Sequence, residues 1–121
     1  MRIGMATSLS AANAEEWATQ IEQLGCRSIV FPLDYRANEN DIADYTDEAR
    51  KHDLTIAEVG IWKNVLSADK DKRDEARRYA VGQLRLADEI GARCCVNIAG
   101  TYGGPIWDGG YKENFGNECW K

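Results

Sequence analysis

Residues 23–30 and 89–96 carry the same pattern: an apolar residue, a glycine, a small residue and an arginine, followed by a run of small and apolar residues. A weaker version occurs at residues 51–56. Glycine just after the last periodic residue is typical of a helix end, because it readily adopts the positive φ that closes a helix. A helix-to-strand junction that recurs along a chain is typical of α/β folds, either a (β/α) barrel or a doubly wound sheet.

The second of these junctions ends the longest helical pattern in the chain, which runs from residue 69 to residue 90. Apolar residues recur there at steps of three and four and form one face: Ala76, Ala80, Leu84, Ala87 and Ile90. The run at residues 94–99 is apolar on both faces, which is typical of a parallel strand covered by helices. We therefore expect an amphipathic helix whose Leu84 is buried against the sheet.

Earlier strands and helices are expected on the N-terminal side of this unit. The strand patterns occupy residues 2–7, 28–33 and 55–61. One helix should begin at Asn13, where Glu16 three residues later resembles a capping box, and another at Asn38 or Asn40. Residues 101–121 have neither period. The chain is therefore predicted to be a single domain, 1–121, of parallel strands and outer helices, in which 101–121 is a Gly- and aromatic-rich loop or a truncated tail.

The faces of the third and fourth expected strands distinguish a barrel from a doubly wound sheet. Alternation assigns one apolar set to the faces that helices cover: Val59, Ile61, Val96 and Ile98. The opposite faces carry Ile56 and Glu58 in one strand, and Cys95 and Asn97 in the other. A doubly wound sheet would bury the polar groups of Glu58 and Asn97 at a high cost. In a barrel they face inward near the C-terminal strand ends, so the pattern favours a (β/α)8 barrel.

Length and charge narrow the class of protein. The 121 residues suffice for one modest domain, and the formal net charge of -5 argues against a nucleic acid or an anionic membrane as partner. No apolar run approaches the roughly 20 residues of a membrane helix, and residues 1–10 lack a signal-peptide core, so we expect a cytoplasmic protein. The cysteines have no metal-binding spacing, and no metal site is predicted in this chain.

Three segments, taken in order, resemble those of a known family. They are residues 56–64 (IAEVGIWKN), 86–93 (LADEIGAR) and 96–100 (VNIAG). Their order and spacing resemble the xylose isomerase-like TIM barrels described as sugar phosphate isomerases/epimerases, and essentially the whole chain corresponds to the first four βα units of that pattern. A complete barrel has eight strands in about 250 residues, so the resemblance implies the N-terminal half of a barrel.

The resemblance also implies a reaction. Family members move a proton between carbons of a sugar or sugar phosphate through an enediolate, with a divalent metal (Mn, Mg, Co or Zn) that polarises the carbonyl and a carboxylate that transfers the proton. In the family these groups lie on the later strands, so none of them transfers to a position in this chain. We therefore expect the chain to be inactive alone, and whether it should be called an enzyme stays open.

Five residues are candidates for the substrate-facing part of such a site: Asp34, Glu58, Trp62, Asn97 and Trp107. Glu58 is the candidate catalytic residue, as a hydroxyl acceptor or auxiliary acid/base, or else it is a structural hydrogen-bond acceptor. Asn97 either binds a sugar hydroxyl or ties neighbouring strands together. Trp62 and Trp107 either pack against the apolar face of a sugar or belong to ordinary packing. Asp34 follows the second expected strand.

Two other interpretations stay open. One is a fragment of an abasic-site endonuclease-like barrel, against which the net charge of -5 argues, because DNA binding needs a basic surface. The other is a non-catalytic half barrel that is stable as an assembly. Four barrel strands leave two unpaired edges, which favour pairing with another chain. The expected partners are therefore a small-molecule sugar or sugar phosphate and either a second copy of the chain or a missing C-terminal half.

Overall fold

The computed structural model describes residues 2–6, 9–104 and 109–121. Strands and helices alternate in the order β1 (Gly4–Met5), α1 (Ala14–Gln23), β2 (Ser28–Val30), α2 (Glu39–Lys51), β3 (Thr55–Gly60), α3 (Lys70–Glu89) and β4 (Cys94–Val96), followed by a short 3-10 helix, η1 (Lys112–Phe115). This alternation confirms the α/β class that the repeated junction predicts. Each strand ends earlier than its sequence pattern suggested.

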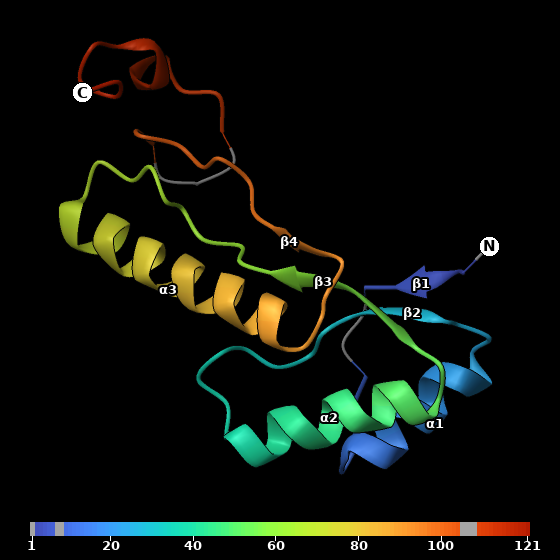
Figure 1. The fold of residues 1–121 in the computed structure, drawn as a ribbon. Coiled ribbons are helices and arrows are strands. Elements are labelled where there is room, and N and C mark those ends of the chain that lie inside the picture. The colour runs from blue at the N-terminus through green and yellow to red at the C-terminus, as the bar shows by residue number, and fades with distance from the viewer. Residues whose placement is uncertain (1, 7–8, 105–108) are drawn as a thin grey trace. The chain divides into compact units, whose positions relative to one another are not determined.

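The four strands form one parallel sheet in the order β1-β2-β3-β4, so each lies beside its neighbour in sequence (Figure 1). Gly4 pairs with Ser28 across β1 and β2, and a Cβ atom at Gly4 would lie 2.9 Å from the Ser28 Cβ atom. Only glycine allows this close approach. Doubly wound sheets reverse their strand order at a switch point, and the described strands show no such reversal.

The chain divides into two compact units. The first consists of residues 1–60 and 83–95, and the second of residues 61–82 and 96–121. Helix α3 belongs to both, because its N-terminal part lies in the second unit and its C-terminal part in the first. The second unit thus contains the segments that directly follow β3 and β4.

The hydrophobic core lies in the first unit, between the sheet and its helices. Helices α1 and α2 lie side by side on one side of the strands (Figure 1). The core consists of Trp17, Ala18, Ile21, Ile29, Phe31, Ile42, Ala49, Leu54, Ile56, Val59, Leu86, Ala87 and Ile90. Because these residues come from all three helices and from β2 and β3 or the residues beside them, one cluster holds the layers together.

The helix ends follow the predicted capping pattern. Asn13 caps α1, and its side chain accepts the N–H of Glu16 at 2.9 Å, while the Glu16 carboxylate accepts the N–H of Ala12 at 2.7 Å. These bonds resemble a capping box, except that the Glu16 carboxylate reaches the N–H of the residue before the cap rather than that of Asn13. Asn38 caps α2. Gly25 and Gly91 have φ of +73° and +71°, as expected of the glycines that end α1 and α3.

The prediction that Leu84 is buried is wrong. Leu84 is 53% exposed, whereas its neighbour Gln83 is only 2% exposed. The buried stripe of α3 includes Ala76, Ala87 and Ile90 as expected, but it passes through Gln83. Successive helical residues are about 100° apart, so the two neighbours cannot share the stripe, and apolar character alone selected the wrong one.

Two strand faces also differ from the predicted alternation. A register shift between β2 and β3 pairs Ile29 with Ile56 but Val30 with Glu58, and Ile56 and Val59 therefore both reach the core. A bulge of this kind reverses the alternation on one side of it. In β4, Cys95 packs against the core, opposite to its expected side. The assignment of Ile56 and Cys95 to the inner face is therefore wrong.

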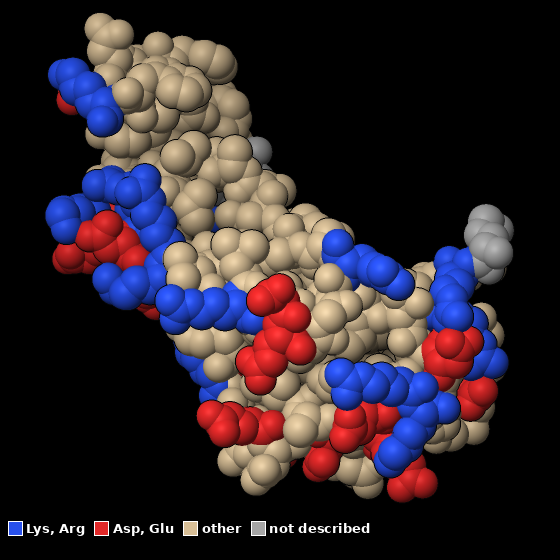
Figure 2. Space-filling view, viewed as in Figure 1, with Lys and Arg blue, Asp and Glu red and all other residues tan. Residues whose placement is uncertain are grey.

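Charged side chains of both signs are mixed over α1 and α2 (Figure 2). On α2, Arg50 pairs with Asp47 at 2.9 Å and Lys51 pairs with Glu48 at 2.5 Å. Alternating charges of this kind leave no single-sign field on this surface. Among the helices of the described residues, none is both long and apolar enough to cross a membrane.

Candidate functional site

Beyond the sheet, β3 and β4 continue into two loops of the second unit, at residues 61–69 and 97–104. The main-chain N–H of Ile61 donates to the carbonyl oxygen of Val96 at 2.8 Å, which continues the pairing of the two strands by one step. Ile61 is buried and anchors the first loop. Past this point, hydrogen bonds between side-chain amides and main-chain groups join the two loops.

Asn97 joins the two loops through both ends of its amide group. Its Oδ1 accepts the main-chain N–H of Lys63 at 3.0 Å, and its Nδ2 donates to the Lys63 carbonyl at 3.0 Å. The side-chain amide therefore bonds to Lys63 as a peptide group of a neighbouring strand would. These two bonds favour the strand-tying role of Asn97, because neither end of its amide is left without a partner.

Asn64 makes the reciprocal connection, from the first loop to the second. Its Nδ2 donates to the Thr101 carbonyl at 2.9 Å, and its Oδ1 accepts the Thr101 N–H at 3.0 Å. Gly100 permits the approach: it has φ of +88°, and a Cβ atom there would lie 2.2 Å from the Asn64 Oδ1. We call the two connections, Asn97 to Lys63 and Asn64 to Thr101, the amide clamps.

Thr101 links the amide clamps to the C-terminal segment. Its side chain is 2% exposed, and its hydroxyl group lies 2.8 Å from the Asn114 Oδ1. The same Asn114 oxygen accepts the main-chain N–H of Tyr102 at 2.8 Å. Residues 101–121 were expected to be a loop or a truncated tail, and within the second unit Asn114 of η1 and the carbonyl group of Gly103 hold the Thr101 hydroxyl in place.

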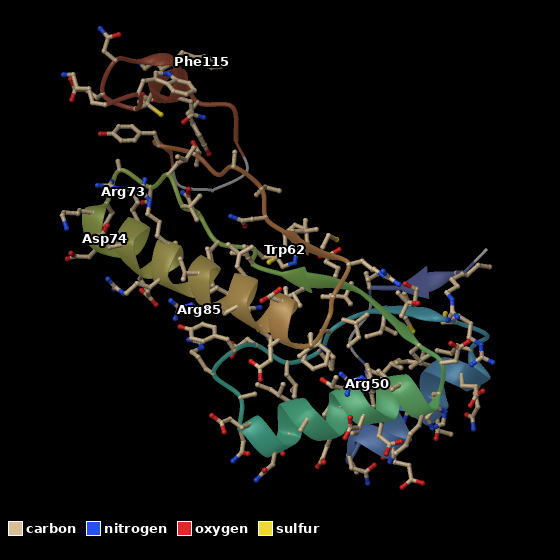
Figure 3. The ribbon with its side chains drawn as sticks, in the orientation of Figure 1. Arg50, Trp62, Arg73, Asp74, Arg85 and Phe115 are labelled. Atoms are coloured by element: carbon tan, nitrogen blue, oxygen red, sulfur yellow. The ribbon has the colours of Figure 1, made fainter. Side chains whose placement is uncertain are left out.

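Trp62 lies between the two anchored residues of the first loop. Its φ of +51° is rare for a bulky side chain, and the residue is 51% exposed just past the end of β3 (Figure 3). Such a conformation costs on the order of 1–3 kcal/mol and persists only where the surroundings impose it. Here the Ile61–Val96 bond precedes Trp62 and the Asn97 clamp on Lys63 follows it. The second unit therefore holds an indole ring in contact with solvent.

Glu58 belongs to the first unit, where it is half-buried in β3. It follows the register shift and pairs with Val30 of β2, and its side chain lies on the face opposite the buried Val59. Within the described part of the chain, its carboxylate has no hydrogen bond or ion pair. A carboxylate in this position is free to accept a hydrogen bond or a proton from a ligand.

Asp34 also belongs to the first unit, in the loop after β2. Its Oδ1 accepts the main-chain N–H of Arg36 at 2.8 Å, and its Oδ2 pairs with the Arg36 guanidinium at 2.7 Å. The first of these is a local turn bond that Asp commonly makes in loops. The carboxylate of Asp34 is therefore already engaged, unlike that of Glu58. Trp107 lies outside the described residues.

Gln83 was missed by the sequence analysis, although it holds this region of the first unit in place. Its Oε1 accepts the main-chain N–H of Tyr35 at 2.8 Å, and its Nε2 donates to the carbonyl of Gly60 at 2.9 Å. One buried amide thus joins the loop after β2 to the end of β3. The spacing of the buried stripe could have revealed it: steps of three and four residues lead from Ala80 through position 83 to Ala87, and position 83 is a polar glutamine.

The N-terminus of α3 provides the clearest electrostatic feature of the second unit. The Asp69 carboxylate accepts the main-chain N–H groups of Asp71 and Lys72, at 3.0 and 3.2 Å. The Lys72 N–H, and then that of Asp71, hold the pKa of Asp69 below its usual value, because they stabilise the charged carboxylate. The pKa of Asp74 is likewise lowered, chiefly by its hydrogen bond with Lys70. The Asp69 carboxylate, directly before the helix, also favours the helix start through its dipole.

The described residues do not fit a divalent metal centre. Among them, no three His, Cys, Asp or Glu side chains are grouped so that they could hold an ion. Hard divalent cations need several oxygen ligands, and the engaged Asp34 and the single carboxylate of Glu58 do not provide such a set. The described residues alone therefore provide no complete ligand set for a divalent metal.

The chain matches no protein-family model, and a comparison with curated proteins gives no match. A functional assignment therefore depends on the residues and geometry described above.

Proposed function

We propose that this chain is the N-terminal half of a (β/α)8-barrel sugar or sugar phosphate isomerase or epimerase. The observation that carries the proposal is the strictly sequential parallel sheet, with Glu58 near the end of β3 and Trp62 just beyond it. Parallel strands in chain order with helical crossovers are the building pattern of a barrel, and barrel active sites form at the C-terminal ends of the strands. The resemblance of residues 56–64, 86–93 and 96–100 to xylose isomerase-like barrels supports the same reading.

Glu58 is the proposed catalytic residue. Its carboxylate is half-buried and unengaged among the described residues, so it can accept a hydrogen bond or a proton from a sugar hydroxyl and assist the carboxylate of the later strands, which removes the proton from the carbon next to the sugar carbonyl. Removal of that carbon-bound proton gives an enediolate. Return of a proton to the neighbouring carbon, together with transfer of the hydroxyl proton from one oxygen to the other, completes an isomerisation with no net change in protons.

Trp62, Asn97, Trp107 and Asp34 are the proposed substrate-binding residues. An exposed indole ring offers a broad apolar surface at low entropic cost, which suits the apolar face of a sugar. The strained backbone of Trp62 supports this role, because strain of this kind concentrates at functional sites. Asn97 acts through the main chain of Lys63, and Asp34 through its pair with Arg36.

The sheet also supports a proposal about assembly. The outer edges of β1 and β4 have no partner strand among the described residues, and unpaired parallel edges favour pairing with another chain. We propose that a C-terminal half closes the barrel, or that two copies face each other as a non-catalytic assembly. A cytoplasmic location is proposed with it, because the cysteine spacings predict reduced thiols rather than a disulfide framework.

Solvent hydrogen exchange tests the activity. A panel of ketoses and ketose phosphates is incubated in deuterium oxide with the 121-residue chain, and separately with the chain joined to its downstream coding sequence. Proton NMR should show loss of the signal next to the carbonyl only with the longer protein, because an enediolate exchanges that hydrogen. Exchange with neither protein, or a coding sequence that stops after Lys121, contradicts the half-barrel isomerase.

Glu58→Gln, measured in the active longer protein, separates the roles of the carboxylate. Loss of proton transfer should lower kcat by about 100-fold. A loss confined to KM would mean that Glu58 only holds a hydroxyl group, because equal binding of substrate and transition state leaves kcat unchanged. Glu39→Gln at the exposed start of α2 is the matched control and should leave both constants unchanged. Unchanged kinetics for Glu58→Gln would make this residue structural.

A further inference from the structure

The second unit contains a cavity of about 280 Å³ beside the first turns of α3. Its walls come from the 61–69 loop, from α3, from Tyr102 and from the C-terminal residues Glu118, Cys119 and Lys121. The charged and polar lining consists of Arg73, Arg77, Tyr102, Glu118 and Lys121. Lys and Arg side chains lie over this start of α3 together with Asp and Glu side chains (Figure 2), and Arg73 lies beside the loop that precedes the helix (Figure 3).

Main-chain carbonyl groups, rather than carboxylates, orient the two arginines. The Arg73 Nη1 donates to the carbonyl oxygens of Ser67 and Ala68, and the Arg77 Nε donates to that of Val65 at 3.3 Å. A carbonyl oxygen fixes a guanidinium group without cancelling its charge. Each guanidinium has five N–H donors, so both arginines keep donors for a ligand.

This arrangement differs from that of most cations in the described part of the chain. Ion pairs with carboxylates engage Arg2, Arg27, Arg36, Arg50, Lys51, Lys70, Lys72 and Lys121. Inside the cavity, Lys121 pairs with Glu118 at 2.6 Å, so these two charges balance each other. Arg73 and Arg77 form no ion pair with a described residue. The cavity therefore has two guanidinium groups that no ion pair engages, although Arg73 lies close enough to Asp74 to help lower the pKa of that carboxyl.

We propose that this cavity binds the phosphate group of a small phosphate monoester, with Arg73 and Arg77 as its ligands. A monoester carries a charge of roughly -1.5 to -2 at pH 7, which the two guanidinium groups match. Arginine donors also fit phosphate oxygens in pairs, which gives orientation as well as charge. The volume is close to the lower end of small-molecule sites, about 300 Å³. The inference goes beyond the proposed isomerase, since it depends on the cavity alone; if both hold, the substrate is a sugar phosphate.

Chemical-shift mapping of the complete chain tests the site directly. Inorganic phosphate, and separately glycerol 3-phosphate, is titrated into labelled protein in a buffer without other multivalent anions. Saturable shifts should appear at the amides of Leu66, Ala68, Tyr102 and Cys119, which line the cavity, and neutral D-xylose should not move them. No saturable shift at millimolar phosphate, or shifts that do not include these residues, would overturn the proposal, whether or not the chain ever shows turnover.

Arg77→Gln and Arg78→Gln form a matched pair for the same titration. Both remove one positive charge from α3, but only Arg77 lines the cavity. Arg77→Gln should weaken phosphate binding at least about 10-fold, the effect expected of one lost charge-assisted contact, whereas Arg78→Gln should change it less than about 2-fold. Equal weakening by both would indicate attraction by overall charge and refute the site. If Arg77→Gln does not fold, the shift map of the native protein decides.

Discussion

Replacement of Gln83 by Leu should destabilise the first unit, although the new side chain is apolar and similar in size. The Gln83 amide bonds to the N–H of Tyr35 and the carbonyl of Gly60 from a position that is 2% exposed. Each hydrogen bond contributes about 0.5–1.5 kcal/mol net, so loss of both predicts about 1–3 kcal/mol. The two main-chain groups left without a partner push the cost toward the upper end.

Urea unfolding followed by circular dichroism measures this change, with the m-value as a check that the same surface unfolds. Leu84→Ala, at the next position of the helix, is the matched control. It truncates a large apolar side chain, yet it should cost less than about 0.5 kcal/mol because Leu84 is 53% exposed. A larger loss for Leu84→Ala than for Gln83→Leu would refute the assigned helix face. A Gln83→Leu variant as stable as the native chain would show that the two bonds contribute nothing net.

Three further predictions concern the second unit. Gly100→Ala should cost at least about 1–3 kcal/mol, because it adds a Cβ atom 2.2 Å from the Asn64 Oδ1 at a φ of +88°, whereas Gly110→Ala, with open space around it, should be neutral by the same urea assay. Asn97→Asp should lower the urea midpoint and change the tryptophan emission, because it replaces the donor to the Lys63 carbonyl with an oxygen; an unchanged emission spectrum would argue against control of Trp62 by this clamp. The charge of Asp69 stabilises the fold above its unfolded pKa of 3.8, and this stabilisation is lost as the pH falls through the lower folded pKa. The stability difference between the native chain and Asp69→Asn should therefore be present at neutral pH and disappear in acid, and a difference that persists there would contradict the assignment.

Local signals in the sequence predicted the order of strands and helices. Asn13 and Gly91 each satisfy main-chain geometry within a few neighbouring residues, so their roles as helix cap and helix end are visible in a short window. The face of the sheet on which a strand residue lies depends on more distant parts of the chain. The bulge that turns Ile56 toward the core depends on how β3 pairs with β2, and the burial of Gln83 depends on two main-chain groups far away in sequence. The periodicity of the sequence indicates neither the β2–β3 register nor the main-chain groups that Gln83 contacts.

The candidate site likewise has features that a short stretch of sequence predicts and others that depend on distant residues. The sequence pointed to Glu58, Trp62 and Asn97 as polar or aromatic residues near strand ends, and the structure shows the surroundings of each. It could not indicate that Trp62 has a positive φ, because that angle is imposed by Val96 and Asn97 from another segment. Nor could it indicate the cavity beside Arg73, whose wall includes residues some 30 to 50 positions away along the chain.

The amide clamps also determine how this protein should age. Asparagine is a thermolabile residue, and slow hydrolysis of its side-chain amide leaves a carboxylate of nearly the same shape. Such a change at Asn97 would set an oxygen against the Lys63 carbonyl, and at Asn64 it would do the same against that of Thr101. The strands are joined by main-chain groups, which this reaction does not touch. Long storage or heating should therefore release the loop that carries Trp62 while the sheet stays folded, and intact-mass measurement would detect each event as a gain of about one mass unit, since NH2 is replaced by OH.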